Sequence, residues 1–190
     1  MQALPPLVTD TAALWPAYGH FLAALKRYDW TACRAVLDAV SPVERTRLIR
    51  SGADEPGLEE WLRGVIRHDP RDGAAFALLG HHLTVVGWNI RSTSLAKDVS
   101  REQWQGFTEW LNKAEQVMIE GCARNPEDPA IWTVRLTSAR GISLGIDEET
   151  RRYNRVAAID EHHLPAQGDH LEQLYPKWGG SWEKAHGFAR

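Results

Sequence analysis

The feature that most constrains the fold is a set of apolar and small residues, spaced at helical turns on two neighbouring segments. The first segment holds an aromatic, a glycine and two leucines: Phe76, Leu79, Gly80 and Leu83. The second mixes small and bulky positions and ends in proline: Ala114, Met118, Gly121 and Pro126. Residues three or four apart share one face of a helix, so both segments predict helices. A glycine on that face lets a second helix approach closely, and the bulky positions can interlock around it.

Helix signals recur along the rest of the chain, whereas strand signals are nearly absent. Ser41 and Ser100 each precede a Glu or Gln by three residues, which is the pattern of a capping box. Asp147 and Ser181 are further expected caps. Pro16 predicts that the first helix starts late or is kinked. The pattern predicts an all-α chain with helices over 11–27, 30–39, 42–51, 57–68, 72–91, 101–124, 129–142, 148–159, 165–174 and 182–190.

Length and composition favour a soluble globular protein of one domain. The chain has 190 residues, of which 43% are hydrophobic and 25% charged, and its net charge is −3. A nucleic-acid-binding domain usually carries a basic excess, so no nucleic-acid partner is expected. We find no signal peptide and no stretch of membrane-spanning length, and we expect no membrane partner. The two cysteines, Cys33 and Cys122, lie in different predicted helices and favour a cytoplasmic location.

The paired segments resemble the two halves of a tetratricopeptide repeat, a helix-turn-helix unit of about 34 residues. In that family an aromatic, a leucine and a small residue mark the first helix, and small residues with a closing proline mark the second. Here the connection between the halves is longer than in the family. The resemblance covers about residues 57–165 and implies an irregular tetratricopeptide-like array of about 8–10 helices. Within one domain over 1–190, residues 1–56 would then form N-terminal helices, and 166–190 C-terminal helices.

The segment 176–183 also resembles a motif, PKWGGSxE, of a group of bacterial tetratricopeptide-like proteins, and this resemblance implies no activity. Two glycines before a capped helix predict a tight turn between helices. The alternative is a backbone nest that binds an anion, with these members: Lys177, Gly179, Gly180 and Ser181.

In the repeat family, first-helix positions away from the packing stripe line a concave groove that binds peptides. The resemblance therefore implies a non-catalytic module that binds a protein or peptide partner between the helices 72–91 and 129–142. Its predicted contacts are His81, Thr84, Trp88, Arg91, Trp132, Thr137 and Arg140. The alternative is that the N-terminal helices fill this groove. Most of the nine tryptophans are expected to pack between helices.

The second hypothesis is an enzyme or small-molecule binder whose pocket is rich in Trp, His and Arg. The long connection after residue 91 would act as its lid. Its candidate polar groups are His81, His82, Arg91, His163 and His170. The sequence contains no phosphate loop, dinucleotide fingerprint or nucleophile elbow, so it identifies no catalytic residue, and we expect no cofactor. Adjacent histidines point in different directions on a helix, so no metal site is expected and structural roles are favoured.

Overall fold

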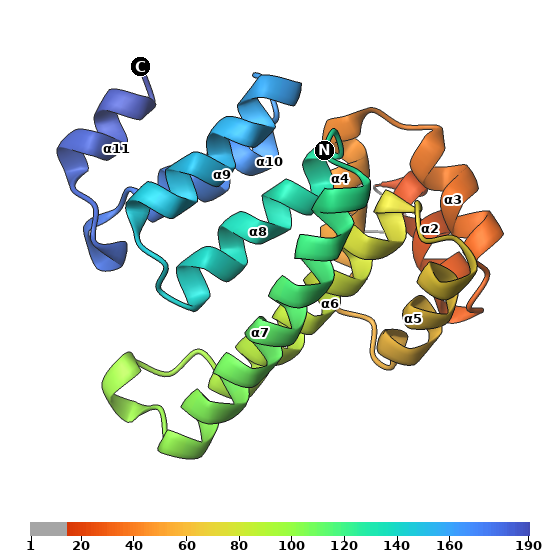
Figure 1. Cartoon of the computed structure of the whole chain (residues 1–190), viewed down its shortest axis with the longest axis horizontal. Coiled ribbons are helices and arrows are strands. Elements are labelled where there is room, and N and C mark those ends of the chain that lie inside the picture. Colours follow the sequence, from red (N-terminus) through yellow and green to blue (C-terminus); the bar gives the residue numbers. More distant parts are fainter. Residues whose placement is uncertain (1–14) are drawn as a thin grey trace, which may run out of the picture.

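The computed structural model describes residues 15–190, and this part of the chain is helical without strands (Figure 1). The N-terminal helices are α2 (Pro16–Lys26), α3 (Trp30–Asp38), α4 (Pro42–Gly52) and α5 (Leu58–His68). The central elements are α6 (Gly73–Arg91), the 3-10 helix η1 (Ala96–Asp98) and α7 (Arg101–Arg124). The C-terminal elements are α8 (Pro129–Gly141), α9 (Ile146–Ile159), α10 (Leu164–Gln173), the 3-10 helix η2 (Pro176–Trp178) and α11 (Trp182–Phe188). The predicted all-α fold is confirmed.

The helix ends follow local capping chemistry. At the start of α7, Ser100 and Gln103 form the predicted capping box. The proline at 16 starts α2, while the expected residues 11–14 of this helix lie outside the described part. The prediction for Asp147 is wrong, because α9 begins at Ile146 after Gly145, which has a φ of +87°. Asp147 lies instead in the first turn, where its negative charge favours the helix N-terminus.

The long hairpin of α6 and α7 is closed by reciprocal contacts at two glycines. A Cβ added at Gly80 would lie 2.5 Å from Cγ of Met118, and one added at Gly121 would lie 2.9 Å from Cβ of Phe76. Each glycine of one helix thus receives a bulky side chain of the other. The spacing pattern predicted this close approach. The four residues belong to the main hydrophobic core or lie directly against it.

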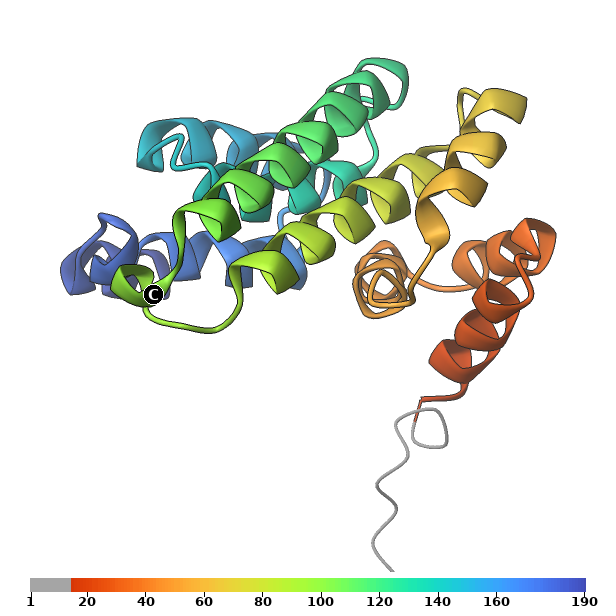
Figure 2. The same cartoon turned by 90° about the horizontal axis from the view of Figure 1, so that it is seen from below.

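The two helices of the hairpin are long, with 19 residues in α6 and 24 in α7. Figure 2 shows α6 and α7 side by side, joined by the segment that contains η1. At this end of the hairpin, Nε2 of Gln103 donates to the carbonyl oxygen of Ile90 at 3.0 Å. This hydrogen bond joins the end of α6 to the start of α7 across the connection after residue 91.

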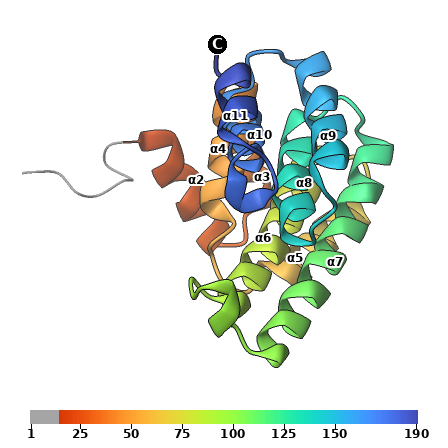
Figure 3. The same cartoon turned by 90° about the vertical axis from the view of Figure 1, so that its left-hand side faces the viewer.

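Helices α4, α5 and α8 pack against this hairpin, and other helices build outward from them. Helix α8 contacts α6 on one side and α10 on the other, while α7 and α9 each pack against α8. Helix α4 contacts α6, α8 and α10, and Figure 3 shows α4 beside α10. Leu48 and Ile49 of α4 are completely buried. An N-terminal helix thus covers the face where the sequence predicted a groove, which was the alternative considered above.

Candidate functional site

The predicted contacts on α6 are spaced three or four residues apart and share one helical face. His81 and Thr84 are buried, and the hydroxyl of Thr84 donates to the carbonyl oxygen of Gly80 at 2.8 Å. Burial and the positive charge of Arg50 lower the pKa of His81 to about 3, so its ring is neutral at neutral pH. Nδ1 of His81 has no hydrogen-bond partner among the described residues. Both side chains belong to the packed interior.

A chain of aromatic and cationic side chains links α6 with α8. The guanidinium of Arg91 lies 5.6 Å from the ring centre of Trp88 and 5.3 Å from that of Trp104. The ring of Trp88 meets that of Trp178 edge to face at 6.4 Å. On the far side, the guanidinium of Arg140 lies 5.6 Å from the Trp178 ring. Such contacts are individually weak, but here they bring three of the predicted contact residues into one cluster.

Arg140 of α8 is buried in a cluster of ion pairs with acidic residues of α10. Its guanidinium donates to the carbonyl oxygen of Asp169 at 3.1 Å and lies 3.3 Å from the carboxylate of Glu172. Arg50 of α4 pairs with the carboxylate of Asp169 at 2.8 Å. Burial raises the pKa of Asp169 despite both arginines. Burial also pushes the pKa of Glu172 upward, but Arg140 and Lys177 outweigh it and the pKa is lowered. The cluster joins α4, α8 and α10.

The other two predicted contacts on α8, Trp132 and Thr137, lie in different surroundings from Arg140. Nε1 of Trp132 donates to the carbonyl oxygen of Pro126 at 2.9 Å, and the guanidinium of Arg135 lies over its ring. Trp132 therefore has no part in the cluster that Trp178 joins. Oγ1 of Thr137 is buried and has no hydrogen-bond partner within residues 15–190. A binding role for the seven predicted contacts stays a prediction.

An open groove lies between α4 and α10, at the surface of the ion-pair cluster. Its volume is about 620 Å³. Arginines of α4 form one wall, and apolar and acidic residues of α10 form the other. The described residues that line this α4–α10 groove are Trp15, Arg47, Arg50, Ser51, Leu164, Pro165, Gly168, Asp169 and Glu172.

Sequence reasoning missed this groove. Leu164 carries the one usable signal, an apolar residue at a helix start, and it is 65% exposed in the structure. The sequence shows no sign that Arg47 and Arg50, more than a hundred residues earlier, face the same space. Their meeting depends on how α4 packs across the later helices.

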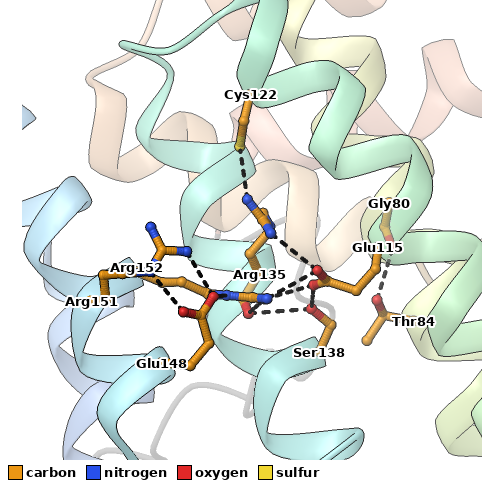
Figure 4. A network of polar contacts seen from close by, with 9 residues as sticks. All are labelled: Gly80, Thr84, Glu115, Cys122, Arg135, Ser138, Glu148, Arg151 and Arg152. Carbon is orange, nitrogen blue, oxygen red and sulfur yellow. Dashed lines mark hydrogen bonds and ion pairs between the residues drawn. The ribbon is translucent and has the colours of Figure 1, made fainter. Parts of the chain in front are cut away.

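A second charged cluster is sealed between α7, α8 and α9 (Figure 4). The carboxylate of Glu115 lies 3.2 Å from Arg135 and 2.7 Å from Arg152, and it also accepts the hydroxyl of Ser138. Arg152 reaches Glu148 at 2.7 Å as well. Burial pushes the pKa of Glu115 upward, but its hydrogen bonds and the two arginines lower it below the usual range. Every charge here has a partner, so the cluster serves as a clamp between helices.

The histidines named in the second hypothesis hold the helices together through ordinary contacts. Nδ1 of His82 donates to the carbonyl oxygen of Ala53, at the end of α4, over 2.9 Å. Nδ1 of His170 lies 2.6 Å from the carboxylate of Glu149, and its ring stacks on Tyr153 at 4.3 Å. These geometries agree with the structural roles that the sequence favoured.

His163 lies apart from this pair. Its Nδ1 lies 3.1 Å from the carboxylate of Asp160, and burial outweighs this partner and lowers the pKa of the ring. No group of three or more His, Cys, Asp or Glu side chains in residues 15–190 is arranged to hold a metal ion. The absence of a metal site in the whole chain stays a prediction.

The two glycines near the C-terminus form a turn. Gly179 has a φ of +87°, and the N–H groups of Gly179 and Gly180 donate to carbonyl oxygens of the preceding residues at 3.1 and 3.2 Å. The hydroxyl of Ser181 caps α11, and the ammonium of Lys177 lies 3.1 Å from Glu172. With these groups already bonded, the geometry favours the turn over the anion nest, which stays a prediction.

Comparison with known proteins adds no family to this picture. No protein-family model, curated protein or solved structure matches the chain. None of the helices within residues 15–190 has the length and apolar character needed to cross a membrane.

Proposed function

We propose that this chain is a non-catalytic, tetratricopeptide-like module that binds a segment of a partner protein in the α4–α10 groove. The observation that carries the proposal is the groove itself, an open channel of about 620 Å³ with two arginines on one wall and an exposed leucine on the other. An open groove between helices suits an extended or helical segment, whereas chemistry usually takes place in an enclosed pocket.

The tetratricopeptide-like part of the proposal is supported by the order of the helices. Helices α6 and α7, and then α8 and α9, are neighbouring pairs, and α6, α8 and α10 follow one another as contacting first helices. The glycine contacts of the central pair have the form expected for close packing in such a repeat. Because α4 lies across the first helices, the proposed binding surface is the edge of α4 and not the usual groove.

Peptide selection with matched leucine variants tests this proposal. Peptides are selected from a random dodecapeptide library, and their affinity is then measured by fluorescence anisotropy. Leu164 in the groove is 65% exposed, and Leu95 near η1 is 66% exposed. Leu164→Ser should weaken binding roughly tenfold, since it removes one buried apolar contact, whereas Leu95→Ser should leave binding unchanged. Equal effects of the two variants, or no selected peptide at all, would overturn the groove assignment.

A second candidate function is the binding of a small molecule between α6 and α8. It is favoured by three buried polar atoms without partners in the described residues: Nδ1 of His81, Nε1 of Trp88 and Oγ1 of Thr137. Buried polar atoms normally have a partner, which can be an ordered water or a ligand. A thermal-shift screen with small polar metabolites tests this candidate, and a hit should lose its effect in Thr137→Val.

A further inference from the structure

The charged side chains that line the α4–α10 groove differ in whether they already have an ion-pair partner. This difference bears on the kind of segment that the groove binds. Both acidic side chains already have cationic partners. Asp169 pairs with Arg50 at 2.8 Å, and Glu172 lies 3.3 Å from Arg140 and 3.1 Å from Lys177. The acids of the groove are therefore largely neutralised by groups of the protein itself.

Arg47 is the exception among the groove's charges. It is exposed on α4 and forms no ion pair within residues 15–190. Its guanidinium lies 5.8 Å from the ring centre of Trp15, whose indole N–H donates to Glu44 at 2.9 Å. An arginine held over an aromatic face keeps the N–H groups at its edge available, and these match the two oxygens of a carboxylate.

The opposite wall offers apolar contact. Leu164 is 65% exposed, Pro165 lies beside it, and Gly168 leaves space because it has no side chain. An apolar side chain that covers Leu164 would gain the ordinary free energy of removing hydrocarbon from water.

A strongly anionic ligand fits the groove less well than a single carboxylate. Arg50 and Arg140 already share their charges with Asp169 and Glu172, so a phosphate dianion in this space would find only Arg47 without an ion-pair partner among the described residues. The guanidinium of Arg47, which has no ion-pair partner within residues 15–190, can pair with one negative charge. The shape and charge therefore favour a segment with an isolated acidic side chain next to an apolar one.

Resting on the proposed function, we infer that the partner segment carries an Asp or Glu beside an apolar residue, with its carboxylate on Arg47 and its apolar side chain on Leu164. Arg47 thus determines the charge preference of the groove. The contact is made with charge-assisted hydrogen bonds and weakens as the salt concentration rises.

A charge swap at Arg47 tests this inference. The random library is selected against the wild type, against Arg47→Glu, and against Arg155→Glu, which changes another exposed arginine that forms no ion pair within residues 15–190. Wild type and Arg155→Glu should enrich peptides with an acidic residue beside an apolar one. Arg47→Glu should enrich peptides with Lys or Arg in its place. A variant that fails to fold cannot produce such an inverted preference.

A synthetic pair of peptides completes the test. The tightest wild-type peptide is made again with its acidic residue replaced by the matching amide, both with blocked ends. The amide should bind the wild type roughly tenfold more weakly and should bind Arg47→Ala as well as the acidic peptide does. If both peptides bind the wild type equally and yet lose affinity for Leu164→Ser, the groove binds its segment without recognising a carboxylate. This inference is then wrong while the proposed function stands. If Leu164→Ser has no effect on any peptide, the proposed function fails with it.

Discussion

Two ion-pair clusters of this protein, one around Glu115 and one in the α4–α10 groove, contain the same residue types but differ in their exposure to solvent. In the cluster around Glu115, the side chains of Glu115, Arg135 and Arg152 are 10%, 9% and 3% exposed, and each charge is paired. In the α4–α10 groove, Asp169 is 6% exposed, but its partner Arg50 is 33% exposed and Arg47 has no ion-pair partner among the described residues. A sealed cluster can only hold helices together, whereas a cluster open on one side can also receive a ligand.

The largest effect is expected from breaking the sealed cluster. Glu115→Ala leaves two buried guanidinium groups without their shared carboxylate. We expect the free energy of unfolding to fall by about 3–5 kcal/mol, because Arg135 loses its only carboxylate partner within residues 15–190 while Arg152 keeps Glu148, and a buried charge without a partner is costly. Urea denaturation measures the change. The control is Glu120→Ala on the same helix, which removes a surface pair with Arg124 and should cost at most about 1 kcal/mol. Similar losses in both variants would refute the clamp.

The close approach of α6 and α7 gives the next largest effect. A methyl group at Gly121 would meet Cβ of Phe76 at 2.9 Å, so Gly121→Ala should destabilise the protein by about 1–3 kcal/mol. Gly64→Ala on α5 is the matched control, since its nearest contact would be an arginine end at 3.7 Å. It should gain about 0.5–1 kcal/mol through better helix propensity. Thermal and urea unfolding of both variants check the expected difference in sign.

Acidification should affect the two clusters in opposite directions. The pKa of Asp169 is raised in the folded state, so its contribution to stability grows as the pH falls from neutral towards 3.8, the ordinary value. The pKa of Glu148, beside the sealed cluster, is lowered to about 2, chiefly by its hydrogen bond with Arg151. Its contribution is present above 4.5 and is lost as the pH falls towards 2.

Urea unfolding at a series of pH values separates these contributions. The stability of the wild type relative to Asp169→Asn should rise on acidification, and its stability relative to Glu148→Gln should fall. Slopes of the same sign for the two variants would contradict the assigned environments.

The smallest effect on stability is expected in the open part of the groove. Arg47→Ala removes an exposed side chain that holds no helix in place, and it should change the free energy of unfolding by less than about 0.5 kcal/mol. Urea denaturation checks this value. A larger loss would mean that the stacking of Arg47 on Trp15 is structural, and the binding tests would then need the charge swap as their main evidence.

Two of the seven predicted contacts, Arg91 and Arg140, illustrate how far the sequence pattern reached. The periodicity placed both correctly on helices α6 and α8, and the structure links them through Trp88 and Trp178. Their side chains, however, are occupied by other groups of the protein. Arg91 donates to the carbonyl oxygens of the connection to η1, and Arg140 is buried against α10. An arginine's partners are invisible in a periodic pattern, because they come from elements far along the chain.

The sequence by itself determined the helical fold, nearly all helix ends, and the approach of α6 and α7 at Gly80 and Gly121. These features depend on residues a few positions apart, or on the matching stripes of two consecutive helices. Only the tertiary structure decided that α4 lies across α6, α8 and α10, and that its arginines meet Leu164 of α10 in one groove. Such contacts depend on the complementary shapes of whole helix surfaces, which no local pattern of residues specifies.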